Sequence, residues 1–144
     1  MKEGAGVLIP ELGSPIDFYR RRFRNQCWTA TILSYAELTA ILKGEGLHQH
    51  HLIPKSLFLH GPMKARDLID YVPSVPLAEA EHLKTLHSAL NGLLRKNDLW
   101  QRDLSASELS RAIDLASEFY ERHGLRHFAA AIRAFRKEAY DRVV

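Results

Sequence analysis

The residues with the clearest chemical potential in this sequence are histidines. The chain has eight of them, and three fall within four positions, at His48, His50 and His51. Two more, His82 and His87, follow further along the chain. Each imidazole has two ring nitrogens, and a buried nitrogen without a hydrogen-bond partner costs about 1–3 kcal/mol. Because histidine is the residue type that most often binds metal or moves protons, the pattern predicts a metal centre or a proton-transfer site.

Two stretches around these histidines resemble a known family. They read His50-His51-Leu52-Ile53-Pro54-Lys55, then Val75-Pro76-Leu77 followed by Glu81-His82 and His87. Together they resemble the HNH nucleases of the ββα-metal superfamily. The resemblance is strongest to the paired-histidine variants found as toxin domains of bacterial polymorphic toxins. It covers residues 46–95, and the flanking helices match no family pattern that we can name.

The resemblance implies a role for each histidine of the pattern. His50 would ligate the metal ion together with His82 and His87. His51 would be the general base that activates water for attack on a phosphodiester. Independently of the resemblance, the charge of Lys55 could contact the cleaved strand. The implied cofactor is one divalent metal ion, Zn²⁺, Mg²⁺, Mn²⁺ or Ni²⁺, which would stabilise the scissile phosphate and the leaving oxygen.

The resemblance also implies a biological setting. The implied activity is that of a DNA endonuclease, which would be the toxin module of an antibacterial effector and would act in the bacterial cytoplasm. Besides nucleic acid, such a module would have a tight-binding, acidic immunity protein as its partner. The N-terminal sequence MKEGAGVLIPELGSP has no basic segment followed by an apolar one, so we expect no signal peptide.

Two features depart from the family pattern. The family usually places an asparagine between the strand and the helix, where it orients the base. No asparagine lies between His51 and His82, and the nearby polar side chains that remain are Asp70 and Ser74. His82 and His87 are five positions apart, about 140° around an ideal helix, so regular turns cannot direct both at one ion. Either the helix begins after His82, or a π-bulge lies between the two histidines, or only one of them is a ligand.

Two functions of other classes remain compatible with the pattern. The histidines could form a structural metal site in a non-catalytic binding module, where no coordination position would stay open. The chain could also be a metal-free helical interaction domain. We expect His48 to be an edge-strand residue, and His60, His123 and His127 to have structural roles. The arginines of residues 20–24 either contact phosphates or line a solvated helix face.

The composition is that of an ordinary globular chain. Its 144 residues are 46% hydrophobic and 26% charged, which argues against disorder and allows one domain with a real core. No apolar run approaches about 20 residues, so we expect no membrane span. The single cysteine excludes an intramolecular disulfide and a cysteine-rich zinc site. The net charge of +3 permits a polyanionic partner.

The expected fold class is α+β and mostly helical. With the resemblance included, we expect a small ββα-metal core with flanking helices and a C-terminal αα-hairpin. Residues 1–144 are then a single nuclease-like domain, divided into an N-terminal section (1–45), the ββα-metal core (46–96) and the helical hairpin (105–142).

Within the core, residues 47–53 have the length of a strand that stops at Pro54. Residues 56–70 read as a loop with a short helix near 63–69. Residues 71–77 contain two prolines, so we expect an irregular or edge strand there. From residue 78 the apolar spacing becomes helical.

Both ends of the chain are expected to be largely helical. In the N-terminal section we expect a short strand at 7–9, a helix at 17–23, and a helix that starts from a capping box at Ser34. In the hairpin, a second capping box at Ser105 and a stop at Gly124 bound one helix, and another helix follows. The residues expected to be buried are Leu109, Ala112, Ile113, Ala116, Phe119, Phe128, Ile132, Phe135 and Ala139.

Overall fold

The computed structural model describes residues 9–23, 33–34, 49–76 and 83–144. The chain has a mostly helical α+β fold, as the sequence predicts. In chain order the elements are α1 (Pro15–Phe23), β1 (Leu33–Ser34), β2 (Gln49–His51), α3 (Lys55–Leu59), α4 (Met63–Arg66), the 3₁₀ helix η2 (Ile69–Tyr71), β3 (Pro73–Pro76), α6 (Leu83–Lys96), α7 (Ala106–Arg122), α8 (Arg126–Phe135), the π-helix η3 (Arg136–Tyr140) and α9 (Asp141–Val143).

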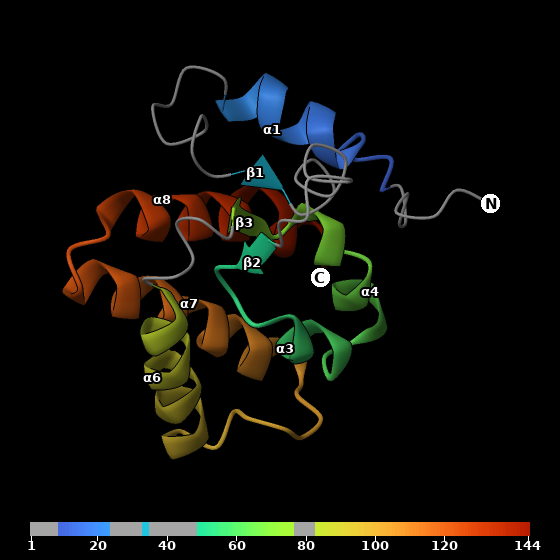
Figure 1. The fold of residues 1–144 in the computed structure, drawn as a ribbon. Helices are drawn as coiled ribbons and strands as arrows, with labels where there is room; N and C mark the ends of the chain where they lie inside the picture. The colour runs from blue at the N-terminus through green and yellow to red at the C-terminus, as the bar shows by residue number, and fades with distance from the viewer. Residues whose placement is uncertain (1–8, 24–32, 35–48, 77–82) are drawn as a thin grey trace.

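The C-terminal hairpin, α7 and α8, is the largest helical unit, and its two helices lie side by side (Figure 1). α7 begins at the predicted capping box. The Ser105 side chain accepts a hydrogen bond from the Glu108 backbone at 3.2 Å, and the Glu108 carboxylate accepts one from the Ser105 backbone at 2.9 Å. Gly124, with a φ of 76°, lies between the helices in the left-handed region that favours glycine. These sequence predictions are confirmed.

The hairpin buries the residues that the sequence assigned to it, and all nine are at most 6% exposed. Phe58 of α3 contacts Phe135 edge-on, with their ring centroids 5.9 Å apart. The Tyr140 hydroxyl donates a hydrogen bond to the Ala106 carbonyl at 2.6 Å, which ties η3 to the start of α7. These contacts make the hairpin the scaffold on which the central part of the chain packs.

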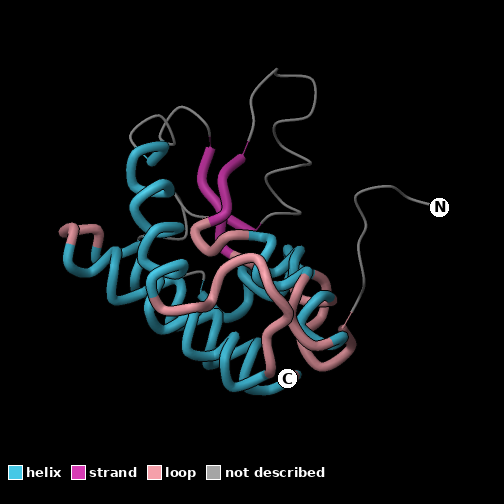
Figure 2. Tube along the Cα trace, turned by 90° about the horizontal axis from the view of Figure 1, so that it is seen from below, coloured by secondary structure: helices cyan, strands magenta, loops and turns pink. Residues whose placement is uncertain are grey.

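The sheet has three short antiparallel strands in the order β1-β3-β2. Of the irregular or edge strand expected at residues 71–77, Pro73–Pro76 form β3, but an edge position is wrong because β3 is the central strand. Its prolines are tolerated because they stand at its two ends, Pro73 opposite Ser34 and Pro76 opposite Gln49. The missing N–H groups therefore do not interrupt the middle of the ladder. Seen from below, the strands lie together at one side of the helices (Figure 2).

The connection between β2 and β3 is more helical than expected. The strand expected at 47–53 is seen at Gln49–His51, and α3 follows it directly after Pro54. The helix expected near 63–69 is the shorter α4, and η2 follows it. The turn between α3 and α4 is tightly packed, since a Cβ added at Gly61 would lie 2.8 Å from a methyl carbon of Leu109.

At the N-terminus, the helix expected at 17–23 begins slightly earlier, at Pro15, a position where proline is favoured. Tyr19 is buried, and its hydroxyl donates a hydrogen bond to the Tyr71 carbonyl at 2.8 Å. Of the strand expected at 7–9, Ile9 forms an isolated bridge with Gly13, and residues 7–8 lie outside the described residues. The helix expected after Ser34 also lies outside them. None of the helices in the described ranges combines the length and hydropathy that a bilayer-spanning segment needs.

Candidate metal centre

β2 places the two adjacent histidines at the edge of the sheet. His50 lies opposite Val75, and His51 lies opposite Ser74. The Leu52 backbone then donates a hydrogen bond to the Pro73 carbonyl at 2.9 Å, which holds the end of the strand. Because successive strand residues point to opposite faces, the two imidazoles leave the backbone in different directions.

α6 brings a third histidine to the same place. Leu90 and Leu94 are fully buried and anchor the helix. His87, one turn earlier, lies against His50 with the ring centroids 5.2 Å apart and the ring planes at 73°. Two imidazoles bound to one Zn²⁺ at about 2.1 Å and a tetrahedral angle hold their ring centroids about 5 Å apart. The observed separation of His50 and His87 therefore fits a shared cation.

Asn91 is a further candidate oxygen donor on α6. It lies four residues after His87 on α6, and positions i and i+4 share one face of a helix. Asn91 Oδ1 and His87 Nε2 are both buried, and neither has a hydrogen-bond partner among the residues that the structure describes. A buried polar atom without a partner costs about 1–3 kcal/mol. Both atoms therefore suit a partner that accepts an electron pair, such as a metal cation. We define the histidine cluster as His50, His51 and His87, with Asn91 beside it.

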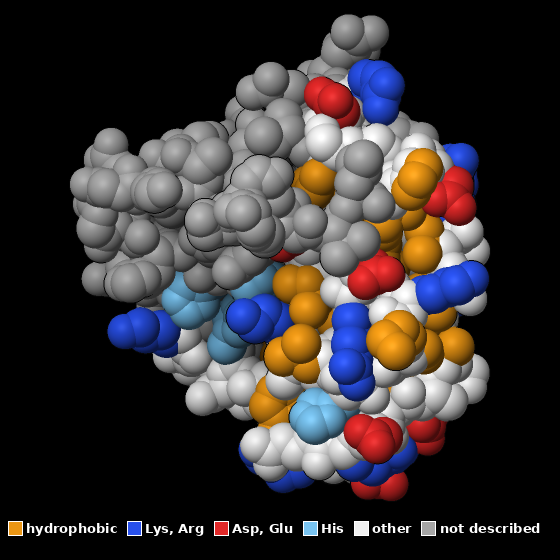
Figure 3. Space-filling model, turned by 90° about the vertical axis from the view of Figure 1, so that its right-hand side faces the viewer, with side chains coloured by type: hydrophobic (Ala, Val, Ile, Leu, Met, Phe, Trp, Pro, Cys, Tyr) orange, Lys and Arg blue, Asp and Glu red, His pale blue; other side chains and the backbone are white. Residues whose placement is uncertain are grey.

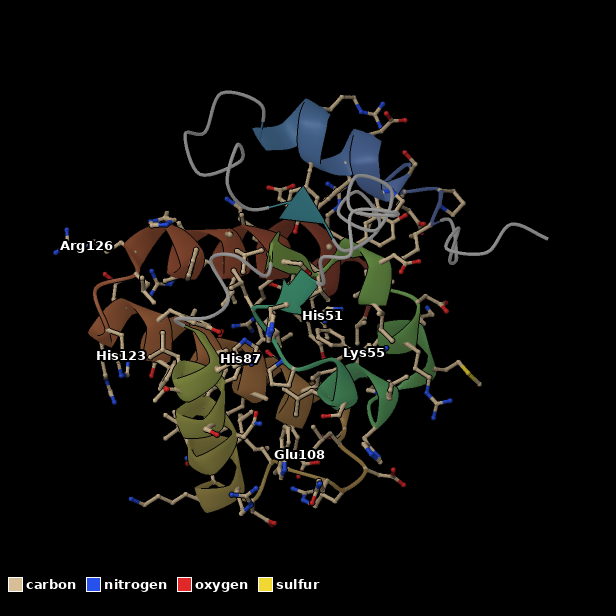
Figure 4. The ribbon with its side chains drawn as sticks, viewed as in Figure 1. His51, Lys55, His87, Glu108, His123 and Arg126 are labelled. Atoms are coloured by element: carbon tan, nitrogen blue, oxygen red, sulfur yellow. The ribbon has the colours of Figure 1, made fainter. Side chains whose placement is uncertain are left out.

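The electrostatics of the cluster keep two of its imidazoles neutral. The pKa of His51 is lowered from 6.5 to about 4, first by burial and then by the positive charge of Lys55 and the neighbouring imidazoles. The pKa of His87 is also lowered to about 4, by burial and by His50. Both rings are therefore unprotonated at pH 7. A neutral ring is the form that binds a metal or accepts a proton. Figure 4 shows His51 and His87 approaching each other from β2 and α6.

Lys55 and the two polar residues considered as replacements for the family's asparagine lie near the cluster. Lys55 is the exposed first residue of α3. Its charge also acts on Asp70, a half-buried residue whose pKa is raised by burial and lowered by Lys55, with a net rise. Ser74 is fully buried and donates a long hydrogen bond of 3.4 Å to the Val72 carbonyl. Of these two, Ser74 is the one placed directly across the sheet from His51.

The structure thus brings together His50, His51, His87 and Lys55, while His82 and His48 lie outside the described residues. From Leu83 onward α6 is a regular α-helix, so the described part of this helix contains no π-bulge. In the described ranges, no three His, Cys, Asp or Glu side chains are arranged to hold a metal ion. The candidate metal donors of the cluster are the imidazoles of His50 and His87 and the amide of Asn91. Asn91 is not among the predicted site residues, because the family pattern places its asparagine before the helix; its sequence signal is the four-residue spacing from His87.

The remaining described histidines lie elsewhere and have structural contacts. His60 is 3.6 Å from the Asp103 carboxylate, and His123 Nδ1 is 2.8 Å from the Phe119 carbonyl. The ring of His127 lies against that of Phe128. These contacts agree with the structural roles expected for the three residues.

A cavity of about 340 Å³ also lies away from the cluster, between α7, α8 and η3. Its lining includes Arg133 and Arg136, which are paired with the carboxylates of Glu121, Asp114 and Asp141. Because these charges are already matched within the protein, the cavity offers less for ligand chemistry than the histidine cluster does.

Comparison with family models, curated proteins and solved structures gave no match to this chain.

Proposed function

We propose that this protein is a metal-dependent endonuclease that hydrolyses phosphodiester bonds in DNA. The observation that carries the proposal is the approach of the His50 and His87 rings to 5.2 Å, from a strand edge and a helix far apart in the sequence. The adjacent His51, neutral at pH 7, supplies the chemical group that such a reaction needs besides the metal.

In this proposal the residues divide into ligands and reacting groups. His50, His87 and Asn91 hold one divalent cation, with His82 as a further candidate ligand. The cation, when bound, supplies Lewis acidity and charge stabilisation at the phosphate. His51 accepts the proton of the attacking water as general base. Lys55, whose charge acts on His51, contributes a positive charge to bind the scissile phosphate of the substrate.

The resemblance to HNH toxin domains supports the same activity and extends it. On that basis we propose that the chain acts in the bacterial cytoplasm as the toxin module of an antibacterial effector. An acidic immunity protein is then its second partner, since an acidic surface would complement a chain with a net charge of +3.

The test is cleavage of supercoiled plasmid by the purified protein with Mg²⁺, Mn²⁺, Ni²⁺ or Zn²⁺, and with EDTA as the metal-free control. His51→Ala should reduce the rate by about 10²–10⁴-fold, because the base acts in the transition state, while metal affinity stays near that of the wild type. His50→Ala and Asn91→Ala should weaken metal binding, and excess metal should restore part of their activity. His127→Ala, on the exposed side of α8, is the matched control and should cleave like the wild type.

Several results would contradict the proposal. If His51→Ala cleaves as fast as the wild type, the assigned base is wrong. If excess metal rescues His51→Ala as well as His50→Ala, His51 is misassigned as the base and instead holds or supports the metal. Metal binding to the cluster without cleavage of DNA or RNA would instead identify a non-catalytic module with a structural metal site.

A further inference from the structure

One surface next to the histidine cluster combines exposed apolar side chains with cations. It is formed by α3 and α4, and we call it the α3–α4 face. It consists of Lys55, Leu59, Met63, Lys64 and Arg66, all exposed. Leu59 is 46% exposed and Met63 is 75% exposed, and they are the exposed large hydrophobic residues of the described part of the chain. Leu59 ends α3 and Met63 begins α4, and these two helices are in contact. Neighbouring exposed apolar side chains are a feature of binding surfaces.

Two cations of this face, Lys64 and Arg66, are exposed on α4. Lys64 and Arg66 form no ion pair with any residue in the described ranges. By contrast, Arg133 and Arg136 of the C-terminal segment are held by carboxylates. Figure 3 shows Lys and Arg side chains interspersed with hydrophobic ones, and with some acidic ones, on this side of the molecule, next to the histidines. The face therefore suits a partner that is both polyanionic and able to accept apolar contacts.

The α3–α4 face continues directly into the histidine cluster. Lys55 begins α3, only four residues after His51 at the end of β2. α3 in turn contacts α4. A molecule that reaches His51 along this side would lie across Lys55 and then across α4.

The backbone beneath the face is firmly supported. Leu57, Phe58 and Ala65 are buried on the inner side of the two helices. At the turn between them, Gly61 approaches Leu109 of α7 closely enough that a side chain would collide with it. The exposed residues are thus presented by a fixed support, which limits the entropy lost when a partner binds.

We propose that the α3–α4 face is the surface that holds duplex DNA beside the histidine cluster, an inference that rests on the proposed endonuclease function. Lys55, Lys64 and Arg66 contact phosphates along the backbone. Met63 and Leu59 make apolar contact inside the minor groove, a use of methionine and leucine common among proteins that bind this groove. The apolar pair distinguishes the face from a purely electrostatic patch.

The test measures binding separately from cleavage. A fluorescein-labelled duplex of about 20 base pairs is titrated with protein in EDTA, and fluorescence anisotropy is followed between about 50 and 200 mM NaCl. The variant Lys64→Ala/Arg66→Ala is compared with Arg122→Ala/Arg126→Ala, which removes the same charge at exposed positions. Figure 4 places Arg126 at the far side of the molecule from Lys55. Thermal melts confirm that each variant is folded.

We expect Lys64→Ala/Arg66→Ala to bind about 10-fold or more weakly at the lowest salt. Its salt slope should be shallower by about 1.8, or about 0.9 for each phosphate that is no longer neutralised. The Arg122→Ala/Arg126→Ala control should stay within about twofold of the wild type, because it touches no phosphate. Met63→Ala should weaken binding without changing the slope, and Met63→Leu should restore it, since the apolar contact releases no counterion.

Equal loss of affinity in the two charge variants would mean that net charge alone drives binding, and would overturn the inference. Wild-type affinity in Lys64→Ala/Arg66→Ala, or no binding of the duplex by the wild type, would also overturn it and would favour a protein partner for this face. Plasmid cleavage tests the proposed function independently. If the wild type cleaves plasmid but Lys64→Ala/Arg66→Ala binds the duplex as well as the wild type does, only the assigned face is refuted. If the binding results are as expected but the wild type does not cleave, only the endonuclease function is refuted.

Discussion

Mild acid should destabilise this protein through His51 and His87. The pKa of each imidazole is lowered from 6.5 to about 4 in the folded protein, mainly by burial. The unfolded chain therefore takes up a proton at each histidine as the pH falls through 6.5, whereas the folded protein does so only near pH 4. Because the unfolded state binds these protons first, the free energy of unfolding must decrease as the pH falls between these values.

The magnitude follows from the two pKa values. Between pH 7 and pH 5, the difference in proton binding lowers the free energy of unfolding by about 2 kcal/mol for each histidine and about 4 kcal/mol for the pair. Both side chains keep some contact with water, so these figures are upper limits. Asp70 acts in the opposite direction, because burial raises the pKa of its carboxyl and its protonation favours the folded state. The pKa of Glu108 is lowered to about 2 by Arg102, so its contribution is lost only below this window.

The assay is urea denaturation at pH 7, 6 and 5 with EDTA present throughout, so that metal binding does not contribute. His87→Gln keeps a polar, uncharged side chain and removes one titrating group. Its loss of stability between pH 7 and pH 5 should be smaller than that of the wild type by about 2 kcal/mol. His127→Gln, at an exposed position of α8, is the control and should lose as much as the wild type. If His87→Gln loses as much as the wild type, burial of a neutral imidazole at this position is refuted.

Two further predictions concern the scaffold. Phe135→Ala should lower the free energy of unfolding by about 3–5 kcal/mol, because Phe135 is fully buried against Phe58; an unchanged denaturation midpoint would contradict this. Ser105→Ala should cost about 1 kcal/mol, because it removes the acceptor for the Glu108 backbone at the start of α7. In the second case the loss should appear in the same denaturation assay, and a neutral effect would mean that the capping box contributes nothing.

The C-terminal hairpin could be predicted from the sequence because its signals are local. The capping box at Ser105, the apolar spacing through Phe119 and the glycine at 124 all act within a few residues of one another. The central position of β3 could not be predicted in this way. Its two prolines argued for an edge, and only the pairing of each end with a different strand shows how they are accommodated.

The site was predictable in part for a similar reason. The residue types of His50, His51 and His87 identified them as candidates, and the structure places them together. The role of Asn91 could not be assigned from its type alone, because asparagine is common on helix surfaces. It becomes a candidate ligand only through the burial of its Oδ1 without a described hydrogen-bond partner, which is a property of the packed structure.

The hairpin and the histidine cluster differ in how far along the chain their contacts reach. α7 and α8 are joined through the turn at Gly124, whereas His50 meets His87 only after the chain has passed through α3, α4 and β3. Closing a longer loop costs more conformational entropy, and contacts between sequence neighbours form faster. The hairpin is therefore expected to fold first, and the cluster to assemble last on a preformed support. In native-state hydrogen exchange, the amides of α7 and α8 should remain protected longer than those of β2, so that local opening of the cluster does not require loss of the fold.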